Sequence, residues 1–501
     1  MNILVNHFKI TNFSKEVGGF VKKYDVRHVF FFCAMPILLF FALFVPVGES
    51  PDEPTHILRA DSVRHFAISG FRFDVQDALG HRVKDVGVRA DPGLLEAVVG
   101  FPAGADKQET LGRLAQKRAI PWRGHREIVS VPNTGVYPVT YYIPLAIGLE
   151  IARLADFGAY DSIIAARLAG GLSYLAIGTL ALSLAKRGRT TIFMLLCLPM
   201  TLFLAASVSQ DGLLIASLCL AAALWTSDPG ELPDRRRWLI GCAIFGLAAM
   251  AKPYIAPLAV VGWIRMPAPT PSIRWQRTSG AALMLAPAIL WSLAMAAFVS
   301  TPFLRAPTPP GPLWSGASDM LFAGTSPIDQ LHVVLAHPYA LLKMSFETMQ
   351  DPDLVLRHEA VGVLGPLQWP LSDDLYEIWS WVILASMLAE LFSVKRGRLR
   401  PHLGHFAGFC ASLGACASSV FLICFLQYLT WTTVGAVHID GIQGRYFLLI
   451  VALMIPILSV PVFRFPGADS VRFLFSLPAV LMTMVGMAPL ASVILHAYYI
   501  R

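Results

Sequence analysis

Charged residues are scarce in this chain of 501 residues. Asp, Glu, Lys and Arg together make up 15% of it, whereas soluble domains carry about 25%. Hydrophobic residues make up 55% of the chain, and the mean hydropathy is +0.58. This balance excludes disordered, collagenous and ordinary cytosolic proteins. It indicates a polytopic membrane protein, whose apolar side chains face lipid.

Several chemical signatures are also missing. The seven cysteines lie in apolar runs without histidines at metal-ligand spacing, which disfavours a disulfide framework. The sequence contains no P-loop and no glycine-rich dinucleotide motif, so ATP-driven transport by this chain alone is disfavoured. The net charge of +7 is modest. The basic residues are interpreted as topology signals, and no nucleic-acid partner is expected.

Apolar runs of about 20 residues identify candidate membrane spans. The first covers 28–47, and a long polar stretch at 48–163 follows it. A second polar stretch, at 301–374, divides the later apolar runs into two groups. The run at 139–155 is short and contains several tyrosines, so it is interpreted as an interfacial helix. The sequence therefore predicts an all-α integral membrane protein with about eleven transmembrane helices and with interfacial helices in its external loops.

Basic clusters predict the orientation, because short cytoplasmic loops hold the excess of Lys and Arg. The clusters lie at 22–27, 186–189, 235–237, 274–277 and 395–400. They predict a cytoplasmic N-terminus and an active site on the external face of the membrane. The predicted divisions are a cytoplasmic tail (1–27), a transmembrane catalytic module (28–300), an external loop (301–374) and C-terminal transmembrane helices (375–501).

A polar motif follows directly after the first span. Asp52 and Glu53 are adjacent carboxylates at the start of a predicted helix that extends to about Ser69. His56 and Arg59 are three residues apart and share one face of that helix. An ionised Asp in this position could accept a proton from a sugar hydroxyl during nucleophilic attack. The alternative is that Asp52 merely caps the helix.

A second motif lies between two late spans. Gly441 and Gly444 flank Gln443, and two glycines would let the backbone approach a ligand closely. Arg445 at the mouth of a span could bind a phosphate through two parallel hydrogen bonds. The alternative is that Arg445 only extends to the membrane surface beside the aromatic anchor Tyr446.

Two further charges complete the candidate site. Lys252 lies between two apolar runs and should face protein, water or a ligand, unless it is a simple interfacial lysine. Asp211 either caps the helix that begins there or joins the same external cavity. Topology places all of these motifs on one face of the membrane. That convergence, more than any single motif, predicts an external active site.

The chain resembles a bacterial family of polytopic membrane proteins catalogued as a domain of unknown function, which belongs with the GT-C glycosyltransferase superfamily. Its layout is also similar to that of the aminoarabinose and protein-mannose transferases of that superfamily. The motifs that carry the resemblance are Asp52-Glu53-Pro54-x-His56-x-x-Arg59, Tyr137-Pro138, Tyr141-Tyr142-x-Pro144, Arg167-Leu168, Lys252-Pro253 and Gly441-x-Gln443-Gly444-Arg445-Tyr446.

The resemblance implies an inverting transferase of the bacterial inner membrane that moves a sugar from a polyprenyl-phosphate donor to a cell-surface glycan or a lipid-linked acceptor. Asp52 or Glu53 is then the base, and Glu49 is a further carboxylate nearby. The donor phosphate is expected to meet Arg445, Lys252 and Arg59. Some members of the superfamily use a divalent metal, but a DxD motif is absent here, so no metal or other cofactor is expected.

Two other functions remain open at this point. A transporter or flippase of lipid-linked sugars would need polar residues spread across the midplane of several spans. A non-catalytic subunit of a polysaccharide assembly complex would keep the fold without needing Asp52.

Overall fold

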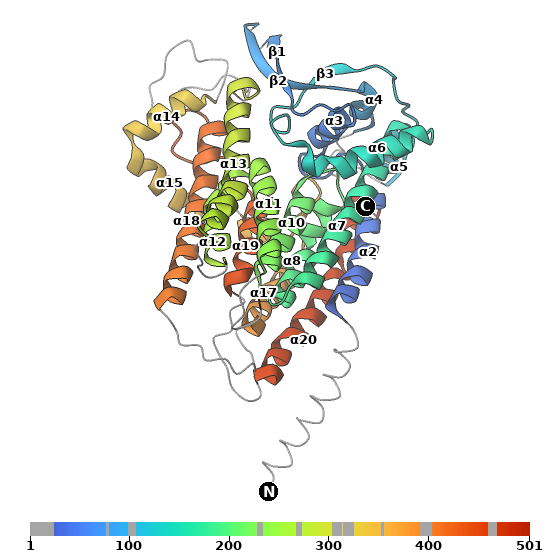
Figure 1. The fold of residues 1–501 in the computed structure, drawn as a ribbon. Coiled ribbons are helices and arrows are strands. Elements are labelled where there is room, and N and C mark those ends of the chain that lie inside the picture. Colours follow the sequence, from blue (N-terminus) through green and yellow to red (C-terminus); the bar gives the residue numbers. More distant parts are fainter. Residues whose placement is uncertain are drawn as a thin grey trace.

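The computed structural model describes residues 25–76, 80–98, 107–227, 234–266, 273–302, 313, 325–351, 355–390, 403–458 and 468–500. Most described residues are helical, and the longest helices run between the two ends of a bundle (Figure 1). A small β-sheet stands at one end, which we call the sheet end. Most of the predicted cytoplasmic tail and the basic cluster at 395–400 lie outside the described residues.

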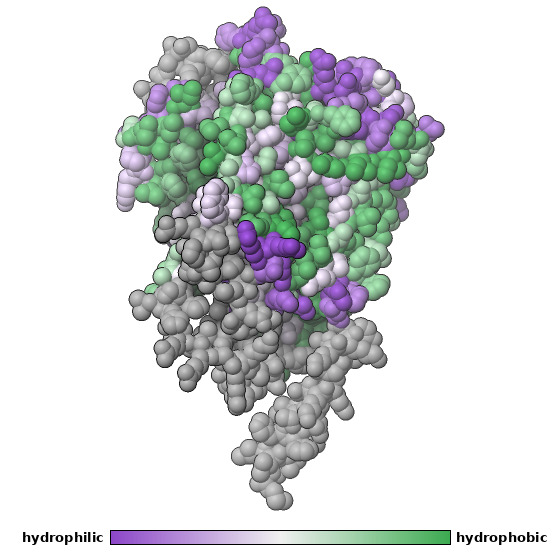
Figure 2. Space-filling view, in the orientation of Figure 1, coloured by the Kyte–Doolittle hydropathy of each residue, from purple (hydrophilic) through white to green (hydrophobic). Residues whose placement is uncertain are grey.

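Five helical segments among the described residues are long and apolar enough to cross a bilayer. Figure 2 shows hydrophobic residues along the flank of the bundle, between hydrophilic groups toward its two ends. The protein is therefore a multi-pass membrane protein, while the predicted total of about eleven spans stays a prediction. The five segments are Val26–Phe44 (α2), Ala159–Leu184 (α7), Thr278–Phe298 within α13 (Ile273–Phe298), Phe406–Thr430 within α18 (Leu403–Thr430), and Leu474–Ile500, which includes most of α20 (Ala468–Met487), α21 (Leu490–Leu495) and η4 (His496–Ile500).

Shorter helices complete the bundle. Proline interrupts two of the apolar stretches, since its ring prevents the preceding turn from continuing. Pro199 separates two helices, and Pro253 follows the helix that ends at Ala251. These shorter elements are α8 (Arg189–Cys197), α9 (Pro199–Ala205), α10 (Asp211–Trp225), α11 (Arg235–Ala251), η2 (Pro253–Leu258), α12 (Ala259–Ile264), α17 (Asp373–Glu390), η3 (Gly444–Phe447) and α19 (Leu448–Leu458).

The first polar segment folds at the sheet end. Three antiparallel strands in the order β1-β2-β3 correct the prediction of an all-α protein. Residues 71–76 alternate between half-buried and exposed positions, as the two-residue period of a strand requires. The elements are α3 (Glu53–Arg64), β1 (Phe71–Gln76), β2 (Arg82–Ala90), α4 (Pro92–Ala97), α5 (Lys107–Arg118), β3 (Glu127–Ser130), η1 (Val139–Tyr142) and α6 (Ile143–Leu154).

Helix α6 lies across the end of the bundle (Figure 1). It has 12 residues, which is too short to cross a bilayer. Ile143, Ile147, Ile151 and Leu154 are exposed at helical spacing along it. An apolar stripe of this kind is typical of a helix in the membrane surface, which is the placement that the sequence predicts for 139–155.

The second polar segment supports the late helices. Helices α14 (Pro327–Ala336) and α15 (Pro338–Gln350) pack on α18, and α16 (Leu356–Val361) packs on η3. A short two-stranded pair, β4 (Val363–Leu364) and β5 (Trp369–Pro370), follows α16. Most of 303–324 lies outside the described residues.

Arginines join these parts by donating hydrogen bonds to carbonyl oxygens at the C-terminal ends of helices. Arg72 of β1 donates to the carbonyl oxygens of Ala296 at 3.0 Å and Ser300 at 2.8 Å, at the C-terminus of α13. At the other end of the bundle, Arg237 donates to the carbonyl of Leu184 at the end of α7, at 2.6 Å. A cation at a helix C-terminus is favourable because the last carbonyls are unpaired and partly negative. The basic cluster at 235–237 therefore has a structural role besides its predicted role in topology.

Candidate functional site

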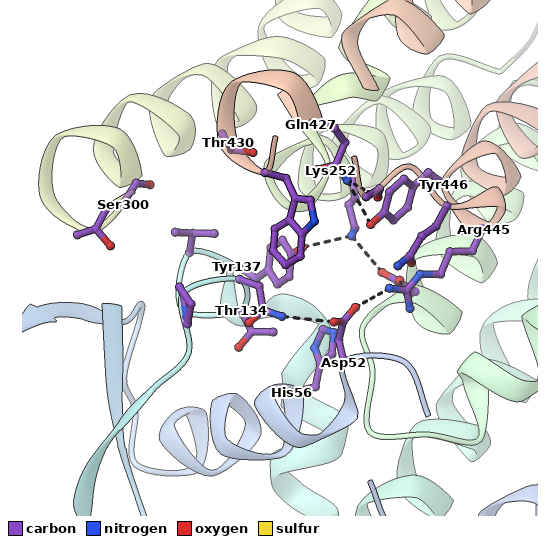
Figure 3. Close-up of a pocket in the computed structure, with 18 residues that line it drawn as sticks. Asp52, His56, Thr134, Tyr137, Lys252, Ser300, Gln427, Thr430, Arg445 and Tyr446 are labelled. Carbon is purple, nitrogen blue, oxygen red and sulfur yellow. Dashed lines mark hydrogen bonds and ion pairs between the residues drawn. The ribbon is translucent and has the colours of Figure 1, made fainter. Parts of the chain in front are cut away.

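A cavity of about 320 Å³ opens at the sheet end, where seven separate parts of the chain meet. Figure 3 shows the charged side chains gathered on one side of it and Ser300 on the opposite side. The lining residues are Asp52 and His56 of α3, Pro132, Asn133, Thr134, Val136 and Tyr137 of the loop after β3, Asp211 of α10, Lys252, Ser300 and Thr301 after α13, Gln427, Thr430 and Trp431 at the end of α18, and Gly441, Gln443, Arg445 and Tyr446.

Asp52 precedes the first turn of α3 but does not cap it. Its backbone is left-handed, with φ of 58°, and its side chain makes no capping hydrogen bond. The carboxylate instead accepts a hydrogen bond from Nη2 of Arg445 at 2.5 Å. Non-glycine residues rarely adopt this conformation, although Asp tolerates it better than most, and such residues concentrate at functional sites. The capping alternative for Asp52 is therefore wrong.

The charge of Arg445 governs the protonation of Asp52. Burial alone would raise the pKa of the Asp52 carboxyl, but the Arg445 charge and hydrogen bond outweigh that effect. The pKa consequently lies below its ordinary value, and Asp52 is ionised at neutral pH. The side chain of Asp52 is 42% exposed, whereas that of Arg445 is 3% exposed. The Asp52 carboxylate is therefore accessible from the cavity, while the cation that holds it is buried.

Arg445 has hydrogen-bonding capacity that no described residue uses. Its Nε and Nη1 atoms are buried and have no hydrogen-bond partner among the described residues. Its Nη1 lies 3.8 Å from Oδ2 of Asp211, which is an ion pair without a hydrogen bond. A buried guanidinium with unsatisfied N–H groups is costly unless a ligand or water satisfies them.

Lys252 is the second cation of the site. Its Nζ lies 3.4 Å from Oδ1 of Asp211 and donates to the Tyr137 hydroxyl at 3.3 Å. It also lies over the rings of Tyr137 and Tyr446, at 4.9 Å and 5.5 Å from their centroids. Asp211 therefore places one carboxylate oxygen toward each cation. It is the first residue of α10 and is not its N-cap, which is Gln210.

His56 is buried beside these charges. Its Nδ1 lies 2.6 Å from the hydroxyl of Tyr142, and its ring stacks on that of Tyr137. Burial lowers the pKa of His56 to about 4, although the carboxylates of Asp211 and Asp52 oppose this. His56 is therefore neutral at physiological pH and can offer a hydrogen bond to a ligand without adding charge.

One comparison with known proteins identifies the family. The family model described as "Predicted membrane protein (DUF2142)" matches residues 35–454. The chain belongs to this family. No curated protein and no solved structure matches the chain. The matched range includes every residue that lines the cavity, so the site belongs to the part of the chain that defines the family.

Two of the sequence-predicted site residues lie outside the cavity. Glu53, proposed with Asp52 as a catalytic carboxylate, is fully buried. Both of its oxygens bind Arg167, at 2.7 Å and 2.6 Å, and the backbone N–H groups of Gly48 and Val208 bind them as well. Because every contact of this carboxylate is with protein, Glu53 supports the segments that carry Asp52 and Asp211 and does not reach a substrate.

Arg59 also turns away from the cavity. Its guanidinium donates to the carbonyl oxygens of Ala67, Ile68 and Tyr137, at 2.6 to 3.1 Å. These bonds fix the chain just after α3, which ends at Arg64 and not near Ser69. The expected contact between Arg59 and a donor phosphate is therefore wrong.

The two glycines of the late motif approach neighbouring protein atoms closely, and Gly441 also lines the cavity. A Cβ atom on Gly441, whose φ is +78°, would lie 2.4 Å from the Trp431 ring, and one on Gly444 would lie 2.0 Å from the Leu356 carbonyl oxygen. The Gly444 N–H donates to Oε2 of Glu359 at 2.7 Å. The glycines thus allow α16 and Trp431 to pack against the segment that presents Arg445. For Gly444, which does not line the cavity, this corrects the expectation that it approaches a ligand.

Several residues of the site carry no motif that sequence reasoning could recognise. Asn133 donates to Oδ1 of Asp52 at 3.5 Å. Gln427 donates to the Gly441 carbonyl at 2.9 Å and contacts the Tyr446 hydroxyl at 3.4 Å. Gln443, which sequence reasoning did select, has a buried Oε1 without a partner among the described residues. The described residues contain no group of three or more His, Cys, Asp or Glu side chains arranged to hold a metal ion.

Proposed function

We propose that this protein is an inverting glycosyltransferase that moves a sugar from a polyprenyl-phosphate donor to a cell-surface glycan or lipid-linked acceptor, on the external side of the membrane. The site would occupy the external face if the sheet end points outward, as the basic clusters predict. The resemblance to the GT-C superfamily supports the reaction class, and the cavity supports the chemistry.

The observation that carries this proposal is the unsatisfied guanidinium of Arg445. Two of its nitrogens lack hydrogen-bond partners among the described residues, it lies beside Lys252 and Asp211, and it lines a cavity. Planar, bidentate recognition by Arg suits a phosphate, and Lys adds a point charge. The two cations therefore favour an anionic head group in the charged half of the cavity.

The opposite side of the cavity suits a sugar. Ser300 lies on that side (Figure 3), and the hydroxyls of Thr301 and Thr430 and the indole of Trp431 also line the cavity. Neutral hydrogen-bonding groups beside an aromatic ring are typical of sites that orient a polar ligand through a few directed contacts. A phosphate-linked sugar would then place its phosphate near Arg445 and its ring toward the neutral groups.

The transfer step follows from these positions. Asp52 accepts the proton of an acceptor hydroxyl, and the resulting oxygen attacks the anomeric carbon of the donor sugar. The bond from that carbon to the phosphate oxygen breaks, and the electron pair leaves on the polyprenyl phosphate. Arg445 and Lys252 stabilise the additional negative charge on the phosphate. His56 stays neutral and contributes hydrogen bonding, because its pKa is about 4.

The test combines a cell and a purified reaction. Surface glycans from a deletion strain, a strain complemented with wild type and a strain complemented with Asp52→Asn are compared by mass spectrometry. We expect one sugar to be lost from the deletion and Asp52→Asn strains. The donor named by that sugar is then synthesised as a polyprenyl-phosphate conjugate and offered to purified protein.

Two outcomes would contradict the proposal. An unchanged glycan profile in the deletion strain would contradict the proposed transferase activity. Restoration of the sugar by Asp52→Asn, at wild-type expression, would favour a transporter or a non-catalytic subunit of an assembly complex, because neither function needs this carboxylate as a base.

A further inference from the structure

Arg445 faces two candidate partners, Asp52 and an anionic ligand, and both would contact the same nitrogen of its guanidinium. A guanidinium has two bidentate edges, Nε with Nη2 and Nη1 with Nη2. Nη2 belongs to both edges and is the nitrogen that holds Asp52 at 2.5 Å. Nη2 carries two N–H groups, one for each edge, so an anion bound across either edge contacts the nitrogen that Asp52 already holds, while Nε and Nη1 have no hydrogen-bond partner among the described residues.

The charges of the site indicate that Asp52 and an anionic ligand compete for Arg445. Asp52 and Asp211 balance Lys252 and Arg445, so the four side chains sum to zero. A phosphodiester brings one more negative charge, so that three anions compete for two cations. Asp211 lies between both cations with a side chain that is 12% exposed, whereas the Asp52 side chain is 42% exposed. Asp52 is the carboxylate that can be released into solvent at the lower cost.

We propose that Arg445 changes partner during the reaction: it is bound to Asp52 in this structure, passes to the donor phosphate when the donor binds, and thereby releases Asp52 to act as the base. The inference rests on the proposed function and assigns an order to it, in which the donor binds before the acceptor is deprotonated. The ligand that releases the base must carry an anion, so a neutral glycan alone leaves Asp52 paired.

The consequence for catalysis is that the base gains strength only beside a bound donor. A carboxylate held by a guanidinium accepts a proton poorly, and a nearby phosphate raises proton affinity because two negative charges repel. An acceptor hydroxyl is therefore activated where a sugar is present to receive it. The same exchange leaves Arg445 on the phosphate at the moment when negative charge develops there.

The test measures the affinity of purified protein for farnesyl phosphate, a short polyprenyl phosphate, in detergent. If Asp52 competes with phosphate for Arg445, Asp52→Asn should bind this probe about three- to tenfold more tightly than wild type, because removing a competing ion pair is worth roughly this factor. Asn adopts the left-handed conformation readily, so the variant should fold. Asp52→Ser provides the same measurement should the Asn variant aggregate.

Two controls separate competition from a general charge effect. Asp74→Asn removes one negative charge from β1, where Asp74 pairs with Arg82 and Lys84 outside the cavity, and it should bind the probe like wild type. Arg445→Ala should bind it at least about tenfold more weakly, because a charge-assisted contact is lost.

The outcomes distinguish this inference from the proposed function. Probe binding that depends on Arg445 but is equal or weaker in the Asp52 variants would overturn the change of partner and leave the phosphate site standing. Tighter binding in both Asp52→Asn and Asp74→Asn would also overturn it, since the effect would be general. Absence of specific binding by wild type would instead contradict the proposed phosphate site itself.

Discussion

Glu53 and Arg167 form a fully buried ion pair in which Nε and Nη2 of the arginine bind the two carboxylate oxygens, and neither side chain is exposed. Arg167 also donates to the carbonyl oxygens of Val45, Pro46 and Ala42 after and within α2. One side chain of α7 thus fixes the end of α2 and the start of α3. The pair sets the position of Asp52, the next residue toward the N-terminus.

Breaking this pair should affect stability before it affects chemistry. We expect Glu53→Gln to lower the free energy of unfolding by about 3–5 kcal/mol, because Arg167 would keep a buried charge without its counter-ion. The double variant Glu53→Gln with Arg167→Met should recover part of the loss, since it removes the stranded charge. The measurement is thermal unfolding in detergent. A Glu53→Gln protein of wild-type stability that had lost all transfer would return Glu53 to a catalytic role.

The adjacent carboxylate should behave in the opposite way. Asp52→Asn should leave the unfolding temperature nearly unchanged, because the Asp52 side chain does not cap α3 and is 42% exposed. Transfer from the donor should fall by about two to four orders of magnitude, the usual scale for loss of a general base. Turnover by purified Asp52→Asn within tenfold of wild type would exclude Asp52 as the base.

Gly444 offers a test of how Arg445 is positioned. A methyl group at Gly444 would lie 2.0 Å from the Leu356 carbonyl, whereas one at Gly414 of α18 meets nothing within 4 Å. Gly444→Ala should destabilise the fold by about 1–3 kcal/mol and weaken binding of farnesyl phosphate. Gly414→Ala is the matched control and should be neutral or slightly stabilising, because Ala favours helix. Equal probe affinity in both variants would mean that α16 does not position Arg445.

His56 predicts how stability depends on pH. Its pKa is lowered from 6.5 to about 4 by burial. As the pH falls below 6.5, His56 therefore binds a proton in the unfolded chain but not in the folded protein. The stabilisation is fully present above that value, and about 2 kcal/mol of it should be lost between pH 7 and pH 5. The unfolding temperature of His56→Gln should fall less over this range. His125, whose pKa is raised by its hydrogen bond to Glu127, is the control, and His125→Gln should not flatten the profile.

The orientation of the protein can be tested with two exposed positions. Ile128 lies on β3 at the sheet end and Arg236 lies at the start of α11. The exposed Cys410 is first replaced by Ser. A membrane-impermeant thiol reagent should then label Ile128→Cys in intact cells and label Arg236→Cys only after permeabilisation. The reverse pattern would place the cavity in the cytoplasm and contradict an external transferase.

The charged core of the site could be inferred from sequence because the bilayer constrains it. Lys252 and Arg445 flank apolar runs, and a charge in that position must face protein, water or a ligand. Topology then places Asp52, His56 and Asp211 on the same side, and all five line the cavity. The positions of the motifs relative to the apolar runs thus predicted which residues meet, while the chemical roles of these residues stay predictions.

The supporting contacts could not be inferred in the same way. Glu53 and Asp52 are equivalent in sequence, and only the position of Arg167, 114 residues away, distinguishes them. Glu359 and Gly444 meet across 85 residues, for which no local pattern exists. The strand at 71–76 did have a local signal, the alternation of Phe71, Phe73 and Val75 with polar residues, but it lies in a segment read only as a polar loop.

The backbone at Asp52 limits what evolution can place there. A left-handed φ of 58° is accessible at low cost to Gly, Asn and Asp, whereas other residues adopt it at a cost of about 1–2 kcal/mol, because their Cβ atom crowds the carbonyl without a compensating local hydrogen bond. Among these three, Asp alone carries a carboxylate. An exchange at this position therefore either strains the turn or removes the acid, and a glutamate would bring both a strained turn and a displaced negative charge.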